Sequence, residues 1–230
     1  MRAMILAAGR GERMRPLTDH TPKPLLAVAG KPLIVWHIER LAQAGLCDIV
    51  INHAWLGERI EAALGDGSTW GVRIRYSPEP QALETAGGIA QALPMLGTQP
   101  FLVINADVWC DWQPAQAATI AARLDGRQRQ AWLLMTDNPE HHPGGDFVLQ
   151  GEQLRDTSAG RRLTFSGIGI YHPSLFATTP RGVPAPLAPL LRQAMARGAV
   201  LGQRHSGDWT DVGTPQRLAE LDARVSSQLI

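Results

Sequence analysis

The chain has 230 residues and a formal net charge of +1, from 22 Lys and Arg against 21 Asp and Glu. This balance offers no general attraction to nucleic acid or an anionic membrane, so we expect small-molecule partners and a locally built anion site. The first apolar run, residues 3–8, is too short for a signal-peptide core, and no other segment approaches transmembrane length. We therefore predict a soluble, cytoplasmic protein, and the oligomeric state stays open.

Two cysteines, Cys47 and Cys110, lie far apart and form no CxxC motif. They fit a reducing compartment and argue against a zinc site.

Short apolar runs alternate with helical patterns along the chain. The runs cover residues 3–8, 49–52, 72–76, 101–104 and 131–135. Apolar side chains at helical spacing cover residues 33–44, 60–64, 89–93, 115–124, 187–197 and 216–225. Strands alternating with helices predict a doubly wound α/β fold with a predominantly parallel sheet. Ligands of such sheets bind beyond the carboxyl ends of the strands.

The second half is less regular. It has a glycine-rich polar patch at residues 141–146, a further strand at 163–171, and four prolines between residues 180 and 189. This change predicts an inserted substrate-binding lobe within one domain that spans residues 1–230.

The first candidate site is the loop LAAGRGERMRPLTDHTPKPL, which follows the first apolar run. Gly9 and Gly11 free backbone N–H groups, while Arg13 and Lys23 can neutralise a polyphosphate. A P-loop is excluded because no G-K-[ST] follows at the required spacing. The dinucleotide fingerprint is excluded because Met14 stands where its third glycine belongs. The loop is then either a polyphosphate site or a solvated basic loop.

Two aspartates are candidate metal ligands. In FLVINADVW, residues 101–109, Asp107 ends an apolar run and can hold a divalent cation or simply cap a turn. In GDWTDVGTP, residues 207–215, Asp211 taken alone would be a loop residue before the Thr214 cap, and Asp208 is the nearby alternative ligand. Two distant carboxylates together with a basic loop favour a metal–triphosphate site.

These motifs resemble those of sugar-1-phosphate nucleotidyltransferases, also called nucleotide-sugar pyrophosphorylases. The opening loop is similar to that family's G-x-G-x-R followed by P-K-P, and the late segment is similar to its W-x-D-x-G-T. The segment SPEPQALETAGGIAQAL, residues 77–93, looks like its base-recognition loop. The resemblance implies a Rossmann-like fold with an inserted sugar-binding lobe. Residues 1–137 would form the nucleotide-binding half, and residues 138–230 the sugar-binding part with the second metal ligand.

The same resemblance implies roles for individual residues. Arg13 would hold the outgoing pyrophosphate, Lys23 would contact the phosphates near the reacting centre, and Asp107 and Asp211 would bind Mg²⁺. The catalytic residues are therefore expected to be Arg13 and Lys23. The expected nucleotide contacts are Ala8, Gly9, Gly11, Glu12, Arg13, Lys23, Glu79, Ala82 and Gly88.

The expected sugar contacts are Asn105, Gly145, Asp146 and Gly167. The glycines let backbone approach a ligand closely, and Asp146 can accept hydrogen bonds from hydroxyls. Many relatives carry an E-K-P lysine on the acceptor phosphate, which has no counterpart here. Arg155, Arg161 or Arg162 are candidates to replace it. The adjacent His141 and His142 are interpreted as plain loop residues.

The base-recognition loop has Glu84 where the family pattern usually has glycine. L-E-T-x-G-G-I is typical of the branch that acts on N-acetylmuramate 1-phosphate. The resemblance then implies uridylyl transfer from UTP to that sugar phosphate, with release of pyrophosphate, in peptidoglycan recycling. Two alternatives stay open: a mannose-1-phosphate guanylyltransferase and a non-catalytic nucleotide-sugar sensor.

Overall fold

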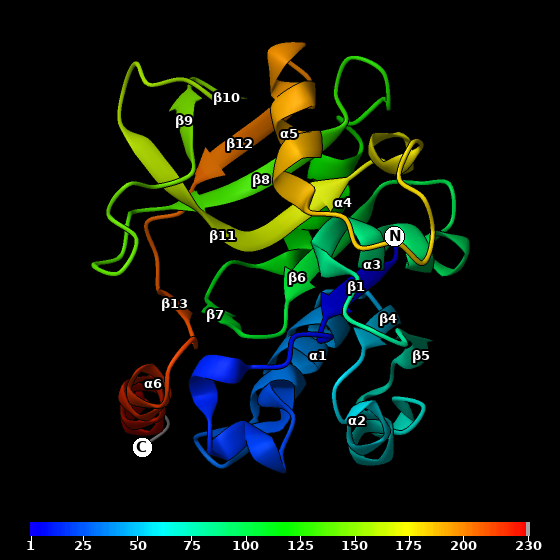
Figure 1. Ribbon diagram of the computed structural model, residues 1–230, viewed down its shortest axis with the longest axis vertical. Helices are drawn as coiled ribbons and strands as arrows, with labels where there is room; N and C mark the ends of the chain where they lie inside the picture. The colour runs from blue at the N-terminus through cyan, green and yellow to red at the C-terminus, as the bar shows by residue number, and fades with distance from the viewer. Residues whose placement is uncertain (229–230) are drawn as a thin grey trace.

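The computed structural model describes residues 1–228, and its centre is a nine-stranded sheet with the order β5-β4-β1-β6-β11-β8-β12-β10-β9 (Figure 1). Its strands are β1 (Ala3–Leu6), β4 (Asp48–His53), β5 (Arg73–Pro78), β6 (Phe101–Asn105), β8 (Ala131–Thr136), β9 (Phe147–Gln150), β10 (Gln153–Arg155), β11 (Arg162–Tyr171) and β12 (Val200–Arg204). Two short pairs lie outside it. They are β2 (Ala27–Val28) with β3 (Lys31–Pro32), and β7 (Val108–Cys110) with β13 (Trp209–Asp211).

The described helices are α1 (Leu33–Gln43), α2 (Gly57–Leu64), α3 (Glu84–Leu96), α4 (Ala117–Ala121), α5 (Leu187–Ala196) and α6 (Pro215–Gln228). Single 3₁₀ turns cover Glu12–Met14, Leu17–Asp19, Lys23–Leu25, Ser68–Trp70, Pro114–Gln116 and Pro173–Phe176. The predicted strands and helices that the sequence patterns indicated are all present, although α4 is shorter than its pattern and the 3₁₀ turn at Pro114–Gln116 precedes it. The short strands β2, β3, β7, β9, β10, β12 and β13 were not predicted.

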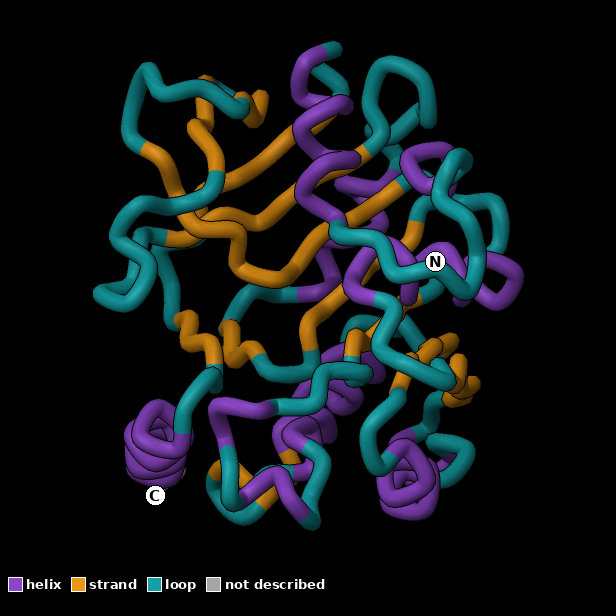
Figure 2. Tube along the Cα trace, viewed as in Figure 1, coloured by secondary structure: helices purple, strands orange, loops and turns teal. Residues whose placement is uncertain are grey.

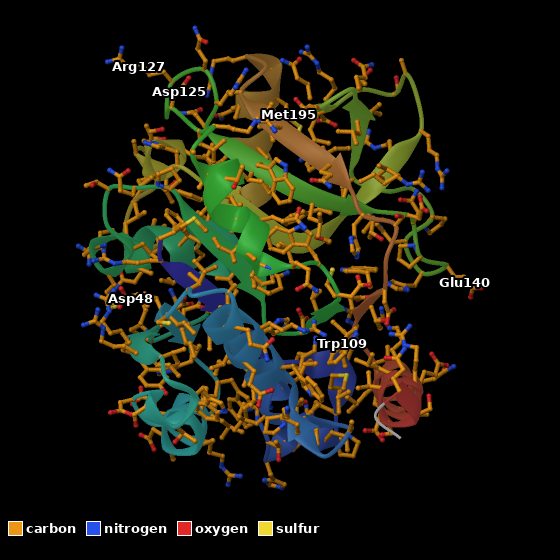
Figure 3. All side chains as sticks on the ribbon, turned by 180° about the vertical axis from the view of Figure 1, so that it is seen from behind. Asp48, Trp109, Asp125, Arg127, Glu140 and Met195 are labelled. Carbon is orange, nitrogen blue, oxygen red and sulfur yellow. The ribbon has the colours of Figure 1, made fainter. Side chains whose placement is uncertain are left out.

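Helices cover both faces of the sheet, as predicted. Side chains of α1, α2 and α4 form one apolar core with Ile5 of β1, and those of α3 and α5 form another with Met4. The alternation of Met4 and Ile5 between the two cores is the period of two that a strand requires. Figure 1 shows α5 in front of β8, β11 and β12, and Figure 3 shows the opposite face from behind.

The prediction of a predominantly parallel sheet is wrong for half of the sheet. β5, β4, β1 and β6 pair in parallel, but β11 is antiparallel to both β6 and β8, and β9 and β10 pair with their neighbours in antiparallel fashion. Within this second half, β12 and β8 still pair in parallel. β9 also pairs with β11, so β11, β8, β12, β10 and β9 close into a five-stranded ring. The short link between β9 and β10 permits only a hairpin. Figure 2 shows these strands gathered away from α2 and α6.

A third apolar cluster joins the two ends of the described chain. Its residues come from the opening loop and the residue after it, β2, α1, β7, the segment after β13, and α6. They are Met14, Leu26, Val28, Leu33, Trp109, Val212, Leu221 and Val225. Trp109 is labelled in Figure 3 beside the opening segment and α6. The cluster fixes the opening loop against the segment that carries Asp211, so residues far apart in sequence meet.

Among residues 1–228, no helix has both the length and the apolar character needed to cross a membrane. The cytoplasmic location and the boundary near residue 137 stay predictions.

Candidate active site

A cavity of about 360 Å³ opens at the carboxyl ends of β1 and β6. The topology explains its place, because parallel strands end there and the loops that follow them diverge. The predicted site residues that line it are Ala8, Gly9, Gly11, Glu12, Arg13, Lys23, Ala82, Asn105 and Asp107. The fold therefore brings together most of the predicted nucleotide contacts, one predicted metal ligand and one predicted sugar contact.

The opening loop is held in shape by contacts of Met14 and Thr18. Met14 is fully buried in the third apolar cluster, which explains why a large side chain stands where the dinucleotide fingerprint needs glycine. Gly11 has φ 69°, and a Cβ there would lie 3.0 Å from Thr18 Cγ2 and 3.3 Å from Lys23 Cβ. Thr18 Oγ1 donates a hydrogen bond to the Gly11 carbonyl at 2.9 Å. The loop is thus pre-shaped around the Lys23 stem.

The three loop arginines have different surroundings. Arg10 stacks on Trp55, with 3.4 Å from its Cζ to the ring centroid, and donates to the Thr18 carbonyl. Arg15 pairs with Asp19 at 2.7 Å. Arg13 lines the cavity, is exposed, and has no ion-pair partner within residues 1–228. Of the three, Arg13 is therefore the one available to an anion in the cavity.

Lys23 is buried, with 8% of its surface exposed, and its Nζ lies 2.5 Å from Asp107 Oδ2. Pro22 and Pro24 flank it and start a 3₁₀ turn, which fixes the backbone that carries the ammonium group. A buried ammonium group costs several kcal/mol of desolvation unless an opposite charge offsets it. The Asp107 carboxylate supplies that charge at the wall of the cavity.

The two predicted metal ligands lie on adjacent backbone segments. β7 and β13 pair in antiparallel register, with Asp211 opposite Val108, and the Val212 N–H donates to the Asp107 carbonyl at 2.8 Å. Gly213, two residues after Asp211, lines the cavity. The predicted alternative, Asp208, pairs instead with Arg224 at 2.8 Å.

Asp211 has two cationic or polar partners that the sequence did not indicate. Arg217 Nη1 lies 2.5 Å and His141 Nε2 lies 2.9 Å from Asp211 Oδ1. His141, interpreted from the sequence as a plain loop residue, therefore reaches the candidate metal site. The donor set of Asp107 and Asp211 is two carboxylates beside a cavity with basic residues, which suits a hard divalent cation that also contacts phosphate. Such a cation would compete with Lys23 and Arg217 for these oxygens.

Glu79 and Gly88 do not line the cavity but stand behind its wall. The Ala7 N–H donates to Asn52 Oδ1 at 3.0 Å, and Asn52 Nδ2 donates to Glu79 Oε1 at 2.7 Å. Glu79 Oε2 in turn accepts from the Leu83 N–H at 2.8 Å. This buried chain of hydrogen bonds ties the end of β1 to the loop before α3. Sequence reasoning missed Asn52, whose signal was a polar residue at the end of a buried strand.

Glu84 begins α3 with φ 57°, the left-handed region that favours glycine. This explains why the family pattern usually has glycine at this position. A non-glycine residue there costs about 1 kcal/mol or more, and such strain is concentrated at ligand sites. Glu84 lines the first cavity and also a second one.

The second cavity, about 500 Å³, adjoins the first and shares Glu84, Thr85 and Asn105 with it. Its other lining residues are Asp146, Phe147, Phe165, Pro186, Leu187, Ala188, Leu191 and Arg192. The predicted sugar contacts Asn105 and Asp146 are therefore in its wall. Asp146 is fixed there because its Oδ2 accepts from the Phe165 N–H at 2.7 Å.

The predicted sugar contacts Gly145 and Gly167 shape this region from behind. A Cβ at Gly145 would lie 2.7 Å from Asn138 Oδ1, and one at Gly167 would lie 2.8 Å from Asn105 Nδ2. Both have positive φ, 58° and 82°. Glycine is needed at both places for close packing, and Gly167 lets Asn105 take its position between the two cavities.

The three arginines considered for the acceptor phosphate lie outside both cavities. Arg155 donates to Gln153 Oε1 at 2.6 Å, Arg161 pairs with Asp137 at 3.0 Å, and Arg162 pairs with Asp156 at 3.1 Å. The arginine that does line the second cavity is Arg192 of α5. Sequence reasoning missed it because it continues an amphipathic helix pattern and belongs to no motif.

Cys110, Asp111 and His205 place potential ligand atoms within 4.8 Å of one another. Burial raises the pKa of the Cys110 thiol to about 12, which opposes the thiolate that a metal requires, and His205 Nε2 already pairs with Asp111 at 2.6 Å. We assign no metal to this group. Both cysteines are free thiols, Cys47 exposed and Cys110 buried.

A parallel half-sheet that ends in a glycine-containing basic loop, with a lysine–aspartate pair at the cavity wall, defines a nucleotide-dependent transferase site. Residues 2–145 match the family model described as nucleotidyl transferase, and the chain belongs to this family. The family predicted from the motifs is thereby confirmed.

Two curated relatives are similar over nearly their whole length. The chain is 59% identical over 226 residues to N-acetylmuramate alpha-1-phosphate uridylyltransferase of Neisseria meningitidis serogroup B, covering 97% of each chain. It is 37% identical over 234 residues to the protein of the same name from Caulobacter vibrioides, covering 97% of this chain and 96% of that one. The predicted likeness to the N-acetylmuramate branch is confirmed.

The fold is also found in a solved structure from Bacillus anthracis, provisionally assigned as a glucose-1-phosphate thymidylyltransferase. The two superpose with a TM-score of 0.84 at 23% identity, covering 98% of this chain and 95% of the other. At this identity the likeness concerns the fold alone.

Proposed function

We propose that the protein transfers the uridylyl group of UTP to N-acetylmuramate 1-phosphate, forming a UDP-sugar and pyrophosphate in peptidoglycan recycling. The observation that carries the proposal is the Lys23–Asp107 pair, with Asp211 on the adjacent strand, at the wall of the first cavity. The 59% identity to the Neisseria enzyme supports this choice of substrates.

The reaction is a displacement at the α-phosphorus of UTP. An oxygen of the acceptor phosphate forms the new bond to phosphorus, and the bond to the bridging oxygen of the β-phosphate breaks with its electron pair leaving on pyrophosphate. A phosphate monoester has its second pKa near 6, so the acceptor is already an anion at neutral pH. No protein base is needed, and positioning and charge are the tasks left to the chain.

The basic residues of the opening loop supply the charge. Lys23, next to Asp107, would neutralise the α-phosphate as charge builds on its oxygens, and Arg13 would hold the departing pyrophosphate. Backbone N–H groups around Ala8, Gly9, Gly11 and Glu12 would hold the triphosphate. Ala82 would contact the base, with Glu79 and Gly88 acting behind it to fix the loop before α3.

Asp107 and Asp211 would together hold one Mg²⁺ ion through their carboxylate oxygens. When bound, this cation offsets the repulsion between the two anionic substrates. Lys23 and Arg217, which pair with these carboxylates, would then be released toward phosphate oxygens.

The second cavity is the proposed place of the sugar. Because it shares Asn105, Thr85 and Glu84 with the first, an acceptor there can present its phosphate to the nucleotide. Asn105 and Asp146 would bind sugar hydroxyls, while Gly145 and Gly167 keep the wall in shape. Both substrates are small molecules, in accordance with the near-neutral net charge and a cytoplasmic site of action.

Product analysis tests this proposal. The protein with UTP, N-acetylmuramate 1-phosphate and Mg²⁺ is followed by phosphorus NMR, and the product is identified by mass spectrometry. We expect UDP-N-acetylmuramate and pyrophosphate in equal amounts, without inorganic phosphate. Hydrolysis of UTP without a sugar nucleotide, or binding without any turnover, would refute it.

A further inference from the structure

We propose that Arg192 binds the lactyl carboxylate of the acceptor and thereby selects N-acetylmuramate 1-phosphate over N-acetylglucosamine 1-phosphate. This inference rests on the function proposed above and adds the residue that determines its specificity.

The two sugars differ by one charged group. N-acetylmuramate carries a lactyl ether on O3 of N-acetylglucosamine, which adds a carboxylate that is ionised at neutral pH. An ionised carboxylate that leaves water for a protein cavity needs a cation or several hydrogen-bond donors. A site that prefers N-acetylmuramate must therefore supply such a partner within reach of the sugar.

The second cavity has a suitable partner at one place in its wall. Its charged lining residues are Glu84, Asp146 and Arg192, so Arg192 is the one cationic side chain among the described lining residues. Phe147, Phe165, Leu187 and Leu191 make much of the remaining wall apolar. Arg suits a carboxylate better than Lys because its planar fork can donate two parallel hydrogen bonds to it.

Arg192 forms one ion pair and keeps further hydrogen-bond donors accessible. Its Nε lies 3.0 Å from Asp156 Oδ2, and Asp156 Oδ1 lies 3.1 Å from Arg162 Nη2. Asp156 thus pairs with Arg192 on its Nε side, and among residues 1–228 no hydrogen bond from Nη1 or Nη2 is found. The side chain is 52% exposed, so these donors are accessible.

The two acidic residues of the second cavity disfavour the lactyl carboxylate at the part of the cavity that they line. Glu84 and Asp146 would repel a second carboxylate placed beside them, and Asp146 is tied to the Phe165 N–H. The phosphate of the acceptor must point to the first cavity, which meets the second at Glu84, Thr85 and Asn105. The lactyl group then lies toward α5 and Arg192.

The test compares kcat/KM for N-acetylmuramate 1-phosphate, its neutral lactyl methylamide, and N-acetylglucosamine 1-phosphate. For the wild-type protein we expect the free carboxylate to be preferred over both neutral acceptors. In Arg192→Gln we expect kcat/KM for N-acetylmuramate 1-phosphate to fall about tenfold or more, mainly through KM, because one partner of a charged pair is lost. Values for the two neutral acceptors should stay within about twofold, and Arg192→Lys should restore part of the preference.

Arg123→Gln is the matched control, because Arg123 also forms one ion pair, with Glu152 at 2.8 Å, and lines neither cavity. It should leave all three values unchanged. A fall of equal size with all three acceptors, or an unchanged preference in Arg192→Gln, would overturn the inference while the proposed function stands. If the wild-type protein does not turn over N-acetylmuramate 1-phosphate at all, the proposed function and the inference fail together.

If Arg192→Gln does not fold, two measurements still test the inference. They are the wild-type comparison of the carboxylate acceptor with its methylamide, and the Arg192→Lys variant. A wild-type protein that uses the acid and the amide equally well would contradict a charged partner.

Discussion

Lys23 Nζ lies 2.5 Å from Asp107 Oδ2, and this pair joins the opening loop to the end of β6 at the wall of the first cavity. The lysine is buried and the aspartate carboxyl is about one-third exposed, with 10% and 38% of their side-chain surfaces accessible. Each charge offsets the desolvation of the other, so the pair is stabilised at the wall of the cavity that we propose for the nucleotide.

Replacing Lys23 with Met should abolish most of the turnover while leaving nucleotide binding measurable. The methionine keeps the apolar stem but removes the charge, and loss of one such stabilising group costs about 100- to 1000-fold in kcat. Steady-state pyrophosphate release checks this. Lys31→Met is the control, since Lys31 pairs with Glu39 at 2.6 Å outside the cavity. A Lys23→Met variant within tenfold of wild-type kcat would contradict the assigned role.

Asp211 and Asp208 can be told apart by the metal dependence of each variant. Asp211→Asn should lower kcat and raise the Mg²⁺ concentration needed for half-maximal rate, because one carboxylate ligand is lost. Asp208→Asn should change neither, since Asp208 pairs with Arg224. A titration of rate against Mg²⁺ for both variants is the measurement, and the opposite pattern would move the metal site to Asp208.

Gly88→Ala should weaken UTP binding through the loop before α3. The new Cβ would lie 2.6 Å from Glu79 Oε1 and 2.8 Å from Asn52 Nδ2, so the buried hydrogen bond between them must shift. We expect KM for UTP to rise about tenfold and the free energy of unfolding to fall by roughly 1–3 kcal/mol. Gly144→Ala, where a Cβ meets nothing within 4 Å, should be neutral. Equal effects of the two substitutions would show that the contact is unimportant.

Stability should depend on pH through His37 of α1. Burial lowers the pKa of His37 from 6.5 to about 4, with a further lowering by Arg40. The unfolded chain therefore binds a proton below pH 6.5 that the folded chain does not bind until about pH 4. Folding free energy is lost as pH falls through this window, by about 3 kcal/mol in total.

Urea unfolding at several pH values between 4 and 7, in the absence of metal, measures this loss. His37→Gln should flatten the profile, whereas replacement of the exposed His20 by Gln should leave it as in the wild type. A profile that His37→Gln does not alter would contradict the assignment.

The hydrophobic pattern of the sequence predicted the parallel half of the sheet. Its strands β1, β4 and β6 are buried on both faces and therefore appear in the sequence as continuous apolar runs. The five-stranded ring of β8 to β12 was predicted less completely, since only β8 and β11 were expected as strands. β10 has three residues and β9 has four, too short for an alternation to stand out, and the pairing of β9 with β11 is a tertiary property.

Residues of the candidate site were also predictable only where they belong to a sequence motif. Lys23 and Asp107 belong to long motifs, were predicted as site residues, and line the first cavity. Arg192 and Asn52 belong to none, and their positions depend on how α5 and β4 pack. Glu79 was expected to contact the base, yet it lies behind the cavity wall, because a sequence does not show which way a side chain points.

The proposed function is tested most directly by comparing kcat/KM for UTP with N-acetylmuramate 1-phosphate and for GTP with mannose 1-phosphate, measured on the same preparation by pyrophosphate release. We expect the first pair to be used at least about 100-fold better, a difference typical of a site that binds the groups by which two substrates differ. A reversed ratio would identify a guanylyltransferase instead, and nucleotide binding without pyrophosphate release from either pair would indicate a sensor.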